Sequence, residues 1–232
     1  MNFLYLMIFT FVLTSSIDAS PTLPQHAATS HHNASQYLRS AGQYALIFTG
    51  REHEKYPLYY INHPWYISAE YHRGTVFANK ISFPDVQMRL DLYRNELVIS
   101  PDNSPFNIVA DADSAIVHGK KIIRISPQIN PSVWGYVVVV HEGKNNRVYL
   151  KNNLMLRQKV VSGVLTQQFE TTRVFWLHYR DDLHRLSKIS DLYPFYPDQR
   201  PAIRSFINDN NLNFRKNPEQ TLVLLMDYLE KL

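Results

Sequence analysis

The 232-residue chain contains no cysteine, and its charges almost balance: 24 Lys and Arg stand against 20 Asp and Glu, a formal net charge of +4. The absence of cysteine excludes a disulfide scaffold, a cysteine-ligated zinc or iron–sulfur site, a thiol nucleophile and a lipid-modified N-terminal cysteine. The small positive surplus is far from the dense basic stripe of a nucleic-acid-binding domain, so we expect no nucleic-acid partner. With 45% hydrophobic and only 19% charged residues, the chain has the composition of a folded protein with a buried core.

Several catalytic motifs are also absent. The chain has no His-Glu-x-x-His zinc helix, no Gly-x-Ser-x-Gly nucleophile elbow and no glycine-rich phosphate loop. Because no local motif marks a metal or an organic cofactor, we expect the protein to work without either. The best remaining set for acid–base or metal chemistry is Asp181, Asp182 and His184, with Glu170 upstream. An arginine on either side of the set is more typical of a solvated hairpin turn.

The chain begins with an apolar run from Phe3 to Leu13, which is too short to cross a bilayer and is followed by small residues. This pattern predicts a signal peptide over residues 1–16, cleaved after Ser16. No Lys or Arg precedes the run, which leaves an uncleaved anchor or a buried strand as alternatives. An exported chain without disulfides favours a Gram-negative envelope. We therefore expect a periplasmic, outer-membrane-associated or secreted protein, with no transmembrane span once the leader is removed.

The pattern changes twice after the leader. Residues 17–35 are rich in Ser, Thr, Pro and His and lack periodicity, which predicts a flexible linker. From Gln36 to Phe48, apolar residues recur at three- and four-residue steps, which predicts a helix. We therefore expect a helix plus antiparallel β domain over residues 36–180 and a C-terminal helical segment, packed on the sheet, over residues 181–232.

Strand signals dominate the middle of the chain. The segment Val86–Leu92 alternates without error between apolar and polar residues, as in a half-buried antiparallel strand. Further short runs follow as far as Tyr179, separated by turn formers such as Asn152-Asn153. These spacings leave no room for crossover helices, so the strands must form hairpins and meanders.

Helix signals return near the C-terminus. Ile203, Phe206 and Ile207 mark a first helix, and Asn217-Pro218 starts a second one with a single apolar stripe. The predicted fold class is therefore α+β: mainly an antiparallel β-sheet meander or a partly closed sandwich or barrel, with an N-terminal helix and two C-terminal helices.

The order of several segments resembles a family of uncharacterised secreted proteins of Bacteroidota. The segments that carry the resemblance are Leu46–Gly50, Asn62–Tyr66, Gly74–Phe77, Leu90–Ile99 and Asn210–Lys216. The resemblance implies secretion and a closing pair of C-terminal helices. The family carries no established activity, so it implies no catalytic residue.

Two groups of residues are candidates for binding. The first is five cations within sixteen residues that contain no acid: Lys144, Arg147, Lys151, Arg157 and Lys159. Strand parity predicts that Arg147 and Lys151, and likewise Arg157 and Lys159, point outward, either as a solvated sheet face or as a site for anionic envelope polymer or lipid headgroups.

The second group is Trp65 and Tyr66, in an aromatic segment that also contains Tyr56, Tyr59, Tyr60 and Tyr71. These rings suit stacking on sugars, although packing in a core is the commoner use of such residues.

The chain thus offers surfaces rather than a convergent set of acids and bases. We expect an exported, non-catalytic binding or envelope-associated structural module of unknown ligand. Its partner would be an anionic envelope polymer or another envelope protein. The alternatives are an extracytoplasmic hydrolase that uses scattered Asp, Glu and His residues, or a scaffold that acts through its C-terminal helices.

Overall fold

The computed structural model describes residues 42, 44–57, 60–101 and 105–232. The predicted signal peptide (1–16) and linker (17–35) lie outside the described residues. All the elements below belong to one unit, residues 43–232.

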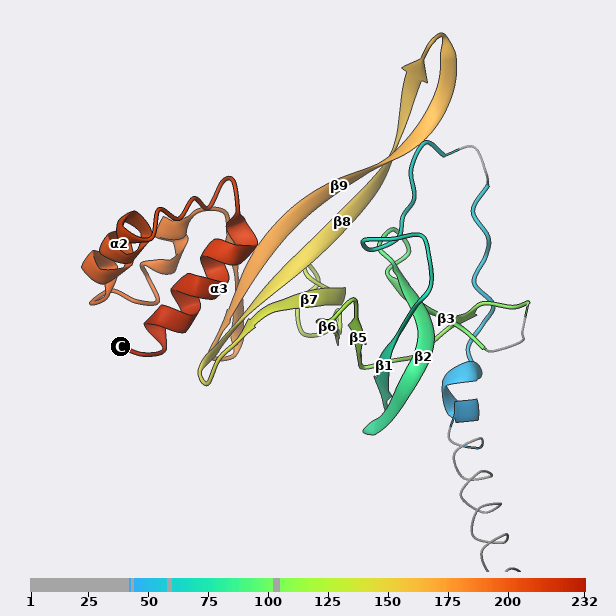
Figure 1. The fold of residues 1–232 in the computed structure, drawn as a ribbon, viewed down its shortest axis with the longest axis horizontal. Coiled ribbons are helices and arrows are strands. Elements are labelled where there is room, and N and C mark those ends of the chain that lie inside the picture. Colours follow the sequence, from blue (N-terminus) through green and yellow to red (C-terminus); the bar gives the residue numbers. More distant parts are fainter. Residues whose placement is uncertain (1–41, 43, 58–59, 102–104) are drawn as a thin grey trace, which may run out of the picture. The chain divides into compact units, whose positions relative to one another are not determined.

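The described chain forms one antiparallel sheet of ten strands (Figure 1). The strands are β1 (His72–Ala78), β2 (Ile81–Asp91), β3 (Glu96–Ser100), β4 (Ile108–Val109), β5 (Ser114–Val117), β6 (Lys120–Ile125), β7 (Gly135–Glu142), β8 (Asn146–Val161), β9 (Val164–Tyr179) and β10 (Asp182–Leu186). Their order in the sheet is β10-β9-β8-β7-β6-β5-β1-β2-β3-β4. Each hairpin therefore lies beside the next, except that the chain returns after β4 to place β5 against β1.

The predicted fold class is wrong, because the sheet is open. Its edges are β10 and β4, which do not pair with each other, so it is neither a barrel nor a partly closed sandwich. Barrel closure requires strands of matched length and stagger. Here the edge strands have five and two residues, whereas β8 and β9 have sixteen each.

The predicted N-terminal helix is also not evident. Residues 36–41 and 43 of that helix lie outside the described residues. In the described part, Gly42, Tyr44 and Ala45 are helical, and the short 3-10 helix η1 (Leu46–Phe48) follows, in which Ile47 is buried in the main core.

The turn expected at Asn152-Asn153 does not form. Both asparagines lie inside β8, where they pair with Arg173 and Thr172 of β9. The continuous ladder of hydrogen bonds with β9 outweighs the local turn preference of the two residues.

The C-terminal part of the chain covers one face of the sheet. It contains the 3-10 helix η2 (Ile189–Leu192) and the helices α2 (Arg200–Asp209) and α3 (Pro218–Leu229). α3 buries Leu222, Leu225 and Met226 in the main core, together with inward side chains of β8 and β9. Among the described residues, no helix is long and apolar enough to cross a lipid bilayer.

A second, smaller apolar cluster lies on the opposite face of the sheet. It consists of Ile125, Val133, Val137 and Tyr149. Val133 belongs to the loop between β6 and β7, residues 126–134, so this loop covers the outer face of β7 and β8. The same loop also covers Lys151, one of the predicted binding residues.

Candidate binding surface

The hairpin of β8 and β9 extends beyond every neighbouring strand (Figure 1). β7 pairs with β8 only as far as Leu150, and β10 pairs with β9 only from Phe175 onward. We call the remaining part, residues 152–173, the arm. Its ten residues per strand span about 33 Å at the usual rise of a β-strand.

The segment before β1 braces the middle of the arm. Tyr60 forms a bridge to Gln167, and Asn62 makes two hydrogen bonds of 2.7 and 2.8 Å to the backbone of Phe169. Phe169 is thereby buried against neighbouring aromatic rings. Beyond this point the arm is a two-stranded ribbon, which is marginally stable in water on its own.

The tip of the arm is apolar on both of its faces. Val160 pairs with Leu165 on one face, and Val161 pairs with Val164 on the other. The exposed fractions are 66% for Val160, 64% for Leu165 and 62% for Val164. The turn between the strands is Ser162-Gly163, and both residues have the positive φ of a tight hairpin.

The arm carries cations and very few acids. Arg157 and Lys159 follow each other on the face that Val161 and Val164 share. Both are exposed, and Arg157 lies 3.6 Å from the carboxylate of Glu170. No Asp or Glu occurs from residue 143 to residue 169. The outer half of the arm therefore combines apolar side chains with positive charge only.

The other two exposed cations of the predicted set lie at the opposite end of the hairpin. Arg147 is paired with Glu142 at 3.3 Å. Lys144 lies in the turn between β7 and β8, where its backbone N–H donates to the side chain of Glu230, the residue that follows α3. These two residues are separated from the tip by most of the length of β8, so the structure does not bring all five cations together.

Lys151 lies on the outer face of β8, as strand parity predicts, but it is not exposed to solvent. Its side chain is buried, because the loop 126–134 covers this part of the outer face. The ammonium group donates to three oxygens: the backbone carbonyls of Trp134 (2.9 Å) and Tyr136 (3.2 Å) and the side chain of Asn95 (3.2 Å). Burial lowers the pKa of Lys151 to about 8, an effect that the three acceptors oppose because they favour the charged form.

Asn95 and Gly135 hold this arrangement together. The Asn95 side chain accepts the Tyr136 N–H at 2.8 Å in addition to the Lys151 bond. Gly135 has φ +87°, and a Cβ at this position would lie 1.4 Å from the amide nitrogen of Asn95. Position 135 therefore requires glycine for both backbone conformation and space.

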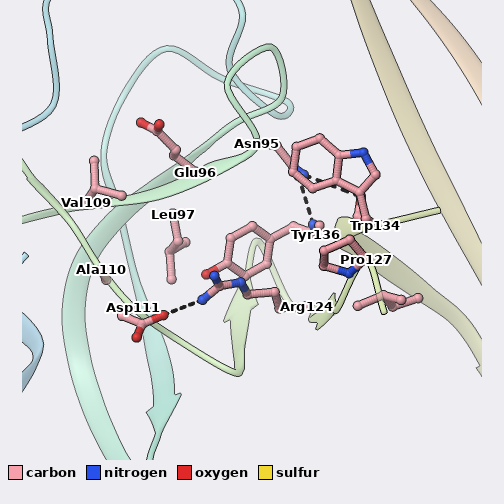
Figure 2. A pocket seen from close by; sticks show the side chains of 12 residues that line it. Asn95, Glu96, Leu97, Val109, Ala110, Asp111, Arg124, Pro127, Trp134 and Tyr136 are labelled. Carbon is pink, nitrogen blue, oxygen red and sulfur yellow. Dashed lines mark hydrogen bonds and ion pairs between the residues drawn. The ribbon is translucent and has the colours of Figure 1, made fainter. Parts of the chain in front are cut away.

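A pocket of about 310 Å³ opens beside this cluster (Figure 2). Asn95 and Trp134 lie at one end of the pocket and the ion pair of Arg124 with Asp111 lies toward the other, with the Tyr136 ring beside Arg124. The Tyr136 hydroxyl donates to a backbone carbonyl at 2.9 Å, and burial raises the pKa of Tyr136 to about 12. The Arg124–Asp111 pair and the Tyr136 hydroxyl are thus already engaged, whereas Glu96 Oε2 is buried without a hydrogen-bond partner among the described residues.

Trp65 is buried rather than displayed on the surface. Its ring packs against His53 and Tyr56, and the Arg89 guanidinium lies 3.6 Å from the ring centroid. Tyr66 is half-buried, and its ring contacts that of His118. The structure thus gives Trp65 a packing role and leaves Tyr66 partly accessible.

A buried polar network beside Trp65 was not foreseen from the sequence. The Asp91 carboxylate accepts a 2.6 Å hydrogen bond from Tyr56 and lies 3.0 Å from His53 Nε2. Its second oxygen accepts the backbone N–H groups of Tyr93 and Arg94, both at 2.9 Å. His53 and Asp91 are buried, so this acid–histidine pair joins the segment before β1 to the β2–β3 turn instead of facing solvent.

The acid–base set suggested by the sequence is dispersed. Asp181 lies in the turn between β9 and β10, and Asp182 and His184 lie on β10. His184 pairs with Leu177, and Glu170 lies seven residues farther along β9, a separation of about 23 Å. Among the described residues, no group of three or more His, Asp or Glu side chains could hold a metal ion.

Comparisons with known proteins add no relative. No family model, no curated protein and no solved structure matches the chain. The arm is therefore the candidate functional site on the strength of its own geometry.

Proposed function

We propose that the protein is an exported, non-catalytic binding module that attaches to anionic lipid surfaces through the tip of the arm. The observation that carries the proposal is the apolar tip, exposed on both faces. A protein partner that packs on one face of a two-stranded ribbon leaves the other face exposed to water, whereas a lipid interface surrounds both faces of the ribbon. Export is part of the proposal through the apolar run Phe3–Leu13.

The energetics favour lipid over an anionic polysaccharide. Complete burial of one Val or Leu side chain contributes about 1.5 to 3 kcal/mol, and the tip offers four such side chains. Each cation near an anionic membrane adds about 1 kcal/mol. A polysaccharide would satisfy Arg157 and Lys159 but would leave the aliphatic side chains exposed to water.

Co-sedimentation with lipid vesicles tests the proposal. We expect wild-type protein to bind vesicles that contain phosphatidylglycerol and to bind pure phosphatidylcholine vesicles weakly. The double substitution Val160→Asp and Leu165→Asp should weaken binding about 100-fold, since the burial of each apolar side chain strengthens binding by a factor of about ten or more. Both side chains are exposed, so the variant should fold normally.

A matched control separates the apolar tip from the charge change. Thr171→Asp and Thr172→Asp add the same two charges to exposed positions near the base of the arm and should weaken binding far less. Arg157→Gln with Lys159→Gln should reduce both the affinity and its dependence on salt. Equal loss of affinity in the tip and base variants, or binding of soluble anionic polysaccharide but not of vesicles, would contradict the proposal.

A further inference from the structure

Two surface pockets adjoin each other on the helical side of the sheet, near the start of α3. The first, of about 440 Å³, is lined by Lys120, Arg173, Lys216 and the first residues of α3. The second, of about 350 Å³, is lined by Arg173, Arg185, Arg215 and Phe214, among others. Arg173 and Pro218 line both pockets, so the two pockets lie next to each other and share the Arg173 side chain.

Charge in these pockets is strongly one-sided. The five basic residues named above line the pockets together with a single carboxylate, Glu219. Arg185 of the edge strand β10 pairs with Trp176 of β9, so its side chain starts from the face opposite the helices. Lys120 and Arg173 already bind that carboxylate, at 3.0 and 2.7 Å. In the described part of the chain, Arg185, Arg215 and Lys216 form no ion pair. Cations gathered in a concave surface repel one another and concentrate anions from solution.

The kind of basic residue indicates the kind of anion. Three of the five are arginines, whose planar guanidinium groups bind two oxygens of a phosphate at once. Phe175 and Phe214 supply an apolar wall in the second pocket, with ring centroids 6.1 Å apart. Such a wall lowers the local dielectric and strengthens each charge–charge contact. The same wall can also pack against the carbon atoms of an organic phosphate.

We propose that the two pockets form one binding site for a phosphate ester that carries two anionic groups, one group in each pocket. Arg173 would lie between the two groups, with Lys216 on the first side and Arg215 on the second. The site lies apart from the tip of the arm and does not depend on the proposed lipid attachment.

Calorimetric titration with inositol 1,4-bisphosphate, which carries two phosphate groups, and with glycerol 3-phosphate, which carries one, tests the site. We expect saturable binding of the bisphosphate by wild-type protein and at least tenfold weaker binding of glycerol 3-phosphate. The variant Arg215→Gln with Lys216→Gln should bind the bisphosphate at least tenfold more weakly. A control variant, Arg200→Gln with Arg204→Gln, removes the same charge from exposed positions on α2 and should change the affinity less than twofold. Absence of saturable binding by the wild type, or equally weakened binding in the two variants, would overturn the proposal.

A second arm of the experiment identifies the source of the phosphate. It uses the tip variant Val160→Asp with Leu165→Asp, so that the arm does not contribute, and vesicles that contain phosphatidylinositol 4-phosphate. Binding of these vesicles that disappears on adding Arg215→Gln and Lys216→Gln supports the site with a lipid headgroup as its ligand. Binding of inositol 1,4-bisphosphate without binding of the vesicles supports it with a soluble ligand.

Discussion

Replacing Asp91 with alanine is expected to lower the free energy of unfolding by about 3 to 5 kcal/mol, the usual cost of removing one partner from a buried charged network. The carboxylate interacts with four groups: Tyr56, His53 and two backbone N–H groups. Without it, buried His53 and three partly buried donors lose their acceptor, and each group left unsatisfied away from water costs about 1 to 3 kcal/mol.

Denaturant unfolding measures this effect. The control is Asp198→Ala, an exposed carboxylate on the same chain, which should change stability by less than about 0.5 kcal/mol. If the Asp91→Ala variant unfolds at the wild-type midpoint, Asp91 is not the buried acceptor that the structure shows.

Lys151 is expected to make stability rise with pH between about 8 and 10.5. Its pKa is about 8 in the folded protein, against the ordinary value of 10.5 in the unfolded chain. Between these values the unfolded state binds more protons, so unfolding becomes less favourable as pH increases. The full effect is about 3 kcal/mol, because one pKa unit corresponds to about 1.4 kcal/mol.

The measurement is the difference in unfolding free energy between wild type and Lys151→Met, below pH 8 and again at pH 10.5. Subtraction removes the contribution of other titrating groups. The difference should move in favour of the wild type by about 3 kcal/mol. The corresponding difference for Lys55→Met, at an exposed position, should stay constant. A constant difference for Lys151→Met would mean that its ammonium group remains in water.

Local pattern predicts some elements of this fold well. The alternation over Val86–Leu92 marks β2, in which Val86, Met88 and Leu90 are buried. Asn217-Pro218 marks the start of α3, whose apolar stripe packs in the main core. These elements are encoded by residues next to one another, so their period is visible in the sequence.

Features that depend on tertiary contacts escaped prediction. Parity correctly places Lys151 on the outer face of β8, but the loop that covers that face comes from residues 126–134. Likewise, Asp91 meets His53 from 38 residues away. Neither contact has a local signature.

The tip of the arm did have a local signal. Val161-Ser162-Gly163-Val164 is a two-residue turn between apolar residues, which is typical of a tight hairpin. The Asn152-Asn153 pair suggested instead that residues 147–151 and 154–161 form two separate strands, whereas they belong to one, β8.

Insertion of the arm tip into an anionic lipid surface is the central claim, and a fluorophore at the tip tests it most directly. The chain has no cysteine, so Leu165→Cys provides a unique site for an environment-sensitive nitrobenzoxadiazole label. Asn208→Cys, at an exposed position on α2, provides the control. We predict that phosphatidylglycerol vesicles shift the emission of the label at 165 to shorter wavelength and leave the label at 208 unchanged. An unchanged spectrum at 165, with the protein bound to the vesicles, would contradict the account.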